Sequence, residues 1–102
     1  MAKKYLITAI IYDKRGRVLS IGRNSYTKTH PLQFKYAKKV GTRDKIYIHA
    51  ELDAVLKCPN LERAHKIVVF RYDNDGNEAN AKPCAVCQEM LSHTKIKIVE
   101  HT

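Results

Sequence analysis

Four residues of this 102-residue chain have the types and the spacing of a metal centre. His49 lies two residues before Glu51, and Cys84 and Cys87 form a C-x-x-C pair directly after Pro83. Imidazole nitrogen and thiolate sulfur are preferred ligands of zinc in proteins. A set of three protein ligands leaves the fourth tetrahedral position for water, which is typical of catalytic rather than structural zinc. We therefore predict one zinc ion per chain, held by His49, Cys84 and Cys87.

Glu51 is the predicted catalytic acid and base of this centre. Its position two residues after His49 brings the carboxylate close to a water on the metal without making it a ligand. The two motifs each begin a predicted helix, and the positive ends of both helices favour ionised thiols. The pattern indicates an enzyme that activates water.

The surrounding sequence predicts the elements that hold these motifs. Dense β-branched and aromatic residues predict strands over residues 5–12, 17–22 and 66–72, and a last strand over 94–100. Helix formers predict helices over 49–58 and 84–92. The fold class is α/β, in the order β-β-α-β-α-β, with a mixed sheet, an N-terminal hairpin and helices packed on the sheet. The continuous apolar run of the first strand predicts burial on both of its faces.

Residues 23–45 are polar, basic and aromatic, with Pro31 and Gly41 interrupting any regular pattern. We expect a long loop with a helical turn over 33–38. Because long loops inside compact domains usually have a function, this loop is a candidate wall of the substrate site.

Length and composition predict one folded domain spanning 1–102, with 44% hydrophobic and 28% charged residues. No apolar run approaches the roughly 20 residues that cross a bilayer, so we expect no membrane partner. The N-terminal residues do not have the pattern of a signal peptide. Three cysteines, an odd number, fit metal binding in a reducing compartment, so we expect a cytoplasmic protein. The net charge of +9 is consistent with binding of polyanions or of phosphate-bearing substrates, and equally with a surface that is simply rich in lysine.

The combination H-x-E and P-C-x-x-C resembles the cytidine and deoxycytidylate deaminase superfamily. The resemblance implies a zinc-dependent hydrolase that replaces the amino group of a cytosine nucleoside or nucleotide by a carbonyl oxygen and releases ammonia. It also implies that His49, Cys84 and Cys87 are the zinc ligands and that Glu51 is the proton shuttle.

The same resemblance suggests residues that bind the substrate. The stretch Gly22-Arg23-Asn24 is similar to a glycine-x-asparagine stretch of the family, whose asparagine binds the nucleoside, so Asn24 is a candidate. Ala50, between the ligand and the acid, is a second candidate. From their place in the long loop, and not from the resemblance, Tyr26 is a candidate to stack on a base and His30 is a candidate at the pocket edge, although aromatic residues of this loop serve equally to pack it on the core. The stretch Cys87-Gln88-Glu89 is similar to the short polar stretch at the same place in enzymes that act on free cytidine.

The chain resembles a trimmed form of the family, without a helix before the first strand and without a fifth strand. Loss of such covering elements predicts exposed apolar surface and therefore a homo-oligomer. Three alternatives stay open: a deaminase of cytosine or adenine in single-stranded DNA or RNA, a non-catalytic zinc-stabilised nucleic-acid-binding module, and a structural zinc site. The last would take its fourth ligand from Cys58, His65, His93 or His101.

Overall fold

The structure is a computed structural model that describes residues 6–25, 30–32, 35, 38, 49–73, 75–81 and 85–102. Its strands are β1 (Leu6–Tyr12), β2 (Val18–Arg23), β3 (Lys66–Tyr72) and β4 (Ile98–His101). Its helices are α2 (Ala50–Lys57), α3 (Ala85–Ser92) and the short 3-10 helix η1 (Leu61–Arg63). Apart from η1, the order of these elements is the predicted β-β-α-β-α-β.

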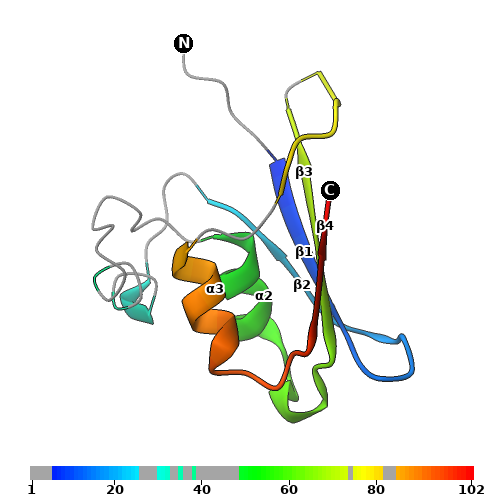
Figure 1. The fold of residues 1–102 in the computed structure, drawn as a ribbon, viewed down its shortest axis with the longest axis vertical. Coiled ribbons are helices and arrows are strands. Elements are labelled where there is room, and N and C mark those ends of the chain that lie inside the picture. Colours follow the sequence, from blue (N-terminus) through cyan, green and yellow to red (C-terminus); the bar gives the residue numbers. More distant parts are fainter. Residues whose placement is uncertain are drawn as a thin grey trace.

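The four strands form one mixed sheet in the order β2-β1-β3-β4 (Figure 1). β1 pairs antiparallel with both β2 and β3, whereas β3 and β4 are parallel. The predicted N-terminal hairpin is confirmed, and its turn uses Gly16 at φ +83°, a backbone conformation that suits glycine. The predicted α/β class with a mixed sheet is confirmed as well.

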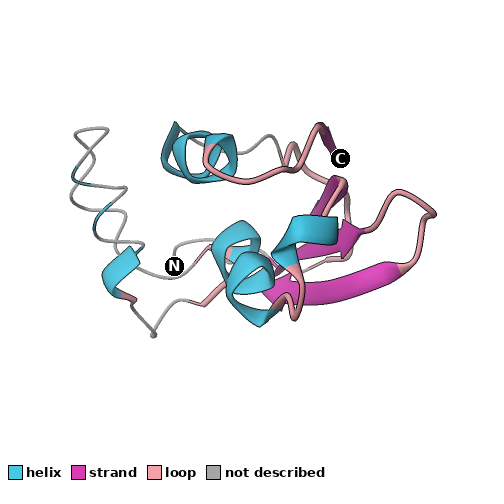
Figure 2. Cartoon of the chain, turned by 90° about the horizontal axis from the view of Figure 1, so that it is seen from below, coloured by secondary structure: helices cyan, strands magenta, loops and turns pink. Residues whose placement is uncertain are grey.

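Both helices lie on the same side of the sheet, and their first residues lie at the same end of the molecule (Figures 1 and 2). The side chains between the layers alternate along the strands, as expected for one buried face. Ala9 and Ile11 of β1 and Ile67 and Val69 of β3 are fully buried there. The core therefore lies between the helices and one face of the sheet.

One burial pattern and one strand boundary differ from the sequence prediction by more than a residue. The expectation that β1 is buried on both faces is wrong: Leu6 is 71% exposed and Ile10 is only half-buried, because the helices cover one face of the sheet. The last strand begins at Ile98 instead of residue 94. The Thr94 hydroxyl donates to Leu91 O and accepts from the Ile96 N–H, so that the segment after α3 is a turn.

Helix α2 is fastened directly to β2. The Ser20 hydroxyl donates a buried hydrogen bond of 2.8 Å to Ala54 O, and the Arg23 N–H donates to Asp53 Oδ2 at 2.9 Å. Between them, a Cβ at Gly22 would stand 2.2 Å from the backbone nitrogen of Ala54. The absence of a side chain at Gly22 lets the helix approach the strand this closely.

Most of the predicted loop over 23–45 lies outside the described residues. Of its predicted turn over 33–38, Lys35 and Lys38 are helical, as are Pro31 and Leu32 before it. Within the described part of the chain, no helix is long and apolar enough to cross a membrane.

Candidate metal centre

His49 stands at the N-cap of α2 with an extended backbone, φ −84° and ψ 155°. Its carbonyl accepts the hydrogen bond of the Asp53 N–H at 3.0 Å, which closes the first turn of the helix. The imidazole makes no capping hydrogen bond. Instead its Nδ1 lies 3.2 Å from Cys87 Sγ on the other helix.

Glu51 and Cys87 lie in the first turns of α2 and α3, and both side chains are buried. Glu51 is 5% exposed and Cys87 is 1% exposed. The Cys87 thiol donates a hydrogen bond to Glu51 Oε2 at 3.2 Å. The ligand atoms of His49, Glu51 and Cys87 all lie within 4.8 Å of one another. Three residues that the sequence analysis placed in one centre are therefore brought together.

The donor set fits a zinc ion. With zinc–nitrogen and zinc–sulfur bonds of about 2.0 and 2.3 Å, two ligands of a tetrahedral ion are roughly 3.5 Å apart. The observed 3.2 Å between His49 Nδ1 and Cys87 Sγ is close to that separation. The third predicted ligand, Cys84, precedes α3 directly and lies outside the described residues, so its role stays a prediction.

The environment of Glu51 is unusual for a carboxylate in a protein core. Buried acids normally have a strong partner, such as a cation or several backbone N–H groups. Among the described residues, its hydrogen-bond partner is the Cys87 thiol, which is a weak donor. A buried acid next to potential metal ligands is typical of a functional site rather than of a structural ion pair.

The predicted substrate-binding residues have structural contacts of their own. Asn24 Oδ1 accepts the Ile7 N–H at 3.0 Å, which joins the end of β2 to β1. His30 Nδ1 accepts the Leu32 N–H at 3.1 Å. Ala50 is fully buried in the core, and Tyr26 lies outside the described residues. Contact of any of these four with a substrate stays a prediction.

The residues considered as a fourth structural ligand are located elsewhere. None of the four joins the group of ligand atoms found among the described residues. Cys58 packs against the core, and His93 pairs with Glu89 at 3.2 Å on the surface of α3. His101 contacts the carbonyl of Thr102, and the His65 backbone pairs with Tyr12 and Lys97.

The sequence motifs did not indicate how the centre is positioned. Gly22 was predicted only as part of a substrate motif, whereas it lets α2 lie directly on β2. A glycine inside a strand pattern is itself a signal of close backbone approach. The roles of Ser20 and Asp53 in anchoring α2 have no comparable signal, because they depend on partners more than 29 residues away.

Comparison with known proteins finds a likeness in structure. No family model matches the sequence, and no curated protein matches it. A solved structure of a cytidine deaminase from Mycobacterium tuberculosis, a glutamate-to-glutamine mutant, is similar to this chain with a TM-score of 0.51. The similarity covers 96% of this chain and 68% of that chain, at 19% sequence identity. The chain thus has the cytidine deaminase-like fold, and the resemblance suggested by its metal motifs is confirmed at the level of fold.

Proposed function

We propose that this protein is a zinc-dependent hydrolase that deaminates a cytosine nucleoside or nucleotide to the uracil product and releases ammonia. The observation that carries the proposal is the buried carboxylate of Glu51, 3.2 Å from Cys87 Sγ, in a group with His49. A structural zinc site has no need for such a carboxylate. A hydrolytic site needs one to move protons.

His49, Cys84 and Cys87 are the proposed zinc ligands. When bound, zinc would supply a Lewis acid that makes water a strong nucleophile at neutral pH. Two of these side chains, His49 and Cys87, come from different helices, so the site exists only when α2 and α3 are in place. Thiol ligands persist in a reducing compartment, and on that ground we infer a cytoplasmic location.

Glu51 performs the proton transfers in this proposal. As a zinc ligand Cys87 would be a thiolate, with its proton released to solvent. Glu51 Oε2, which accepts the hydrogen bond of the thiol in the structure, would then be free to act on water. Oε2 then takes a proton from water as the water attacks the ring carbon that bears the amino group. Glu51 gives this proton to the ring nitrogen. It then takes a second proton from the hydroxyl that the water has left on the ring carbon and gives it to the amino group, which leaves as ammonia while the carbonyl forms. Such general acid–base help typically contributes about a hundredfold to ten-thousandfold in rate.

We propose a free nucleoside or nucleotide as the substrate, in preference to cytosine in a polymer. The support is the similarity of Cys87-Gln88-Glu89 to enzymes of free cytidine. The net charge of +9 does not distinguish a free nucleotide from a polymer, since basic residues bind one phosphate group as well as many. Salt separates the two cases, because a polymer that contacts several cations releases several counterions on binding.

The test is turnover of deoxycytidine, deoxycytidine monophosphate and a cytosine-containing single-stranded oligonucleotide at about 50 and 200 mM salt, followed by absorbance. We expect the free substrates to react faster, with little effect of salt on the nucleoside. An oligonucleotide preference with a steep loss at the higher salt would favour the nucleic-acid deaminase. Full zinc content without ammonia release from any substrate would favour the non-catalytic module.

We also propose that the chain self-associates. Ile98 and Val99 on β4 are 40% and 43% exposed, and Ile21 on β2 is 47% exposed. Exposed apolar residues on sheet strands favour association between chains. Light scattering of the purified protein at micromolar concentration is expected to give a mass above that of one chain, and a monomer would contradict this.

A further inference from the structure

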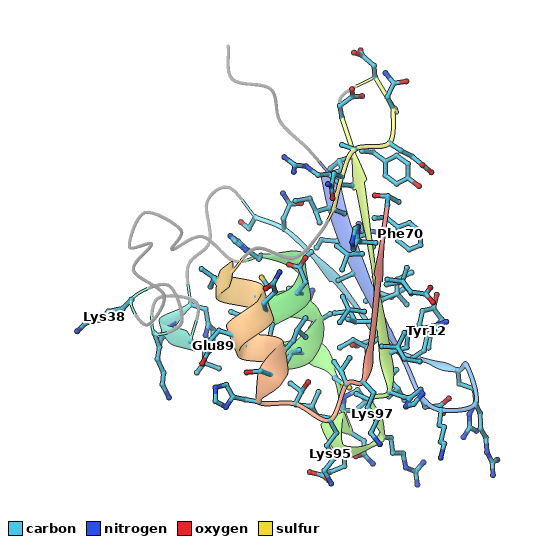
Figure 3. All side chains as sticks on the ribbon, in the orientation of Figure 1. Tyr12, Lys38, Phe70, Glu89, Lys95 and Lys97 are labelled. Atoms are coloured by element: carbon cyan, nitrogen blue, oxygen red, sulfur yellow. The ribbon has the colours of Figure 1, made fainter. Side chains whose placement is uncertain are left out.

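An open cavity of about 550 Å³ lies at the end of the molecule away from the metal centre. Three segments surround it: the turn between β1 and β2, the segment from η1 to β3, and the segment before β4. The first turns of α2 and α3 lie at the metal centre, and both helices run toward the end of the molecule where the cavity lies (Figure 1). Figure 3 shows Lys95 and Lys97 at this end, beyond the last turn of α3. We refer to this cavity as the basic cleft.

The described lining of the basic cleft has a large excess of positive charge. Its cationic side chains are Lys14, Arg15, Arg17, Arg63, Lys95 and Lys97. The lining also contains two acids, Asp13 and Glu62, and each of them is paired with one of these cations. Asp13 binds Arg17 at 3.0 Å, and Glu62 pairs with Lys95. Four cations remain without an ion-pair partner among the described residues.

These four cations are Lys14, Arg15, Arg63 and Lys97, and they come from all three segments. Gathering like charges around one cavity lowers stability through repulsion, and the two acids of the described lining, Asp13 and Glu62, are too few to offset the six cations. A bound anion would remove that repulsion. All four side chains are exposed, so a ligand with several negative charges can contact them together without displacing an ion pair.

The backbone on two sides of the cleft is held by hydrogen bonds. Asp13 Oδ1 accepts the N–H groups of Arg15 and Arg17, each at 2.9 Å, which fixes the turn. The His65 N–H donates to Tyr12 O at 2.9 Å, and the Lys97 N–H donates to His65 O at 2.9 Å. The cations are thus presented by ordered segments, which lowers the entropy cost of binding a ligand.

We propose that the basic cleft binds a linear chain of phosphates, of which inorganic tripolyphosphate is the simplest example. Lysine and arginine are the side chains best suited to phosphate oxygens. The cavity has the size of a small-molecule site, about 300–1,000 Å³, rather than that of an extended strand groove. Phe, Tyr and Trp are absent from the described lining, whereas sites for single-stranded nucleic acid combine basic residues with stacking aromatic ones. The cleft thus favours phosphates over bases, and this proposal is independent of the deaminase activity.

The test is calorimetric titration of the full chain with tripolyphosphate, orthophosphate and a nucleoside triphosphate at about 50 mM salt. Tripolyphosphate is expected to bind at least tenfold more tightly than orthophosphate and about as tightly as the nucleoside triphosphate. The double variant Arg63→Gln/Lys97→Gln is expected to bind at least tenfold more weakly. Lys38→Gln/Lys57→Gln removes the same charge outside the cleft and is expected to change affinity less than twofold. Thermal melting of both variants checks that they fold.

Three results would overturn the proposal. Equal weakening in the two double variants would mean that net charge alone attracts the anion. A tenfold preference for the nucleoside triphosphate over tripolyphosphate would mean that the base is recognised. Binding of a single-stranded oligonucleotide that exceeds that of tripolyphosphate and is lost in Arg63→Gln/Lys97→Gln would make the cleft a nucleic-acid surface.

Discussion

The Cys87 thiol donates to Glu51 Oε2 at 3.2 Å, and this hydrogen bond joins the first turn of α3 to the first turn of α2. The two residues are 36 positions apart in the chain. Their distance is therefore set by how the two helices pack on the sheet. Displacement of either helix start would separate the proposed acid from a proposed metal ligand.

Replacement of either C-x-x-C cysteine is expected to remove the metal. Cys87→Ala and Cys84→Ala each leave two protein ligands, so zinc affinity should fall by more than about a hundredfold, and the melting temperature should fall with it. Cys58→Ala is the matched control, because Cys58 packs against the core outside the group. Zinc per chain is measured by atomic emission. Full occupancy in Cys84→Ala or Cys87→Ala would refute the ligand assignment.

Gly22→Ala is expected to destabilise the fold by about 3 kcal/mol, at the upper end of what overpacking costs. The added Cβ would lie 2.2 Å from Ala54 N and 2.4 Å from Ala50 O, both backbone atoms of α2. Urea unfolding measures the loss, and Gly76→Ala is the control. Gly76 has open space around it but a φ of +82°, so its replacement should cost only about 1 kcal/mol. Equal losses of unfolding free energy in the two variants would mean that α2 moves away from residue 22 at little cost.

Asp13 is expected to stabilise the protein at neutral pH and to lose this effect in acid. Hydrogen bonds from the Arg17 N–H, the Arg17 guanidinium and the Arg15 N–H hold the pKa of Asp13 below its ordinary value, although burial acts the other way. A pKa lowered by folding gives stability that is present above the unfolded value, about 3.9, and is lost as pH falls through the folded one.

Urea unfolding of the wild type and of Asp13→Asn at pH 7 and near pH 3 tests this expectation. The gap between the two proteins should be larger at pH 7. Asp75→Asn, in the exposed turn after β3, is the control for loss of a surface carboxylate. A gap for Asp13→Asn that is the same at both pH values would contradict the expected linkage.

Much of the fold is predictable from local sequence, because β-branched runs and helix formers determine the order of the elements. β3 was predicted with its exact bounds, Lys66–Tyr72. The burial of β1 was not predicted correctly, since a continuous apolar run does not reveal whether helices cover one face of the sheet or both. The start of β4 depends on the Thr94 hydroxyl bonds after α3, which compete with strand formation.

The candidate site was predictable where chemistry imposes residue types at short spacing. His49, Glu51 and Cys87 satisfy that condition, and they meet in the structure. The basic cleft was not predictable, because Lys14, Arg63 and Lys97 are scattered in the sequence and gather only through packing of three segments. The contact between Asn24 Oδ1 and the Ile7 N–H was hidden for the same reason.

The most direct test of the account is ammonia release from a cytosine nucleoside by the zinc-loaded wild type and by Glu51→Gln, with zinc content measured in both. The amide cannot move protons, but His49, Cys84 and Cys87 are unchanged. We expect equal zinc content and a loss of turnover by about a hundredfold to ten-thousandfold. Wild-type turnover in Glu51→Gln, or no ammonia release by the fully zinc-loaded wild type from any cytosine nucleoside or nucleotide, would contradict the account.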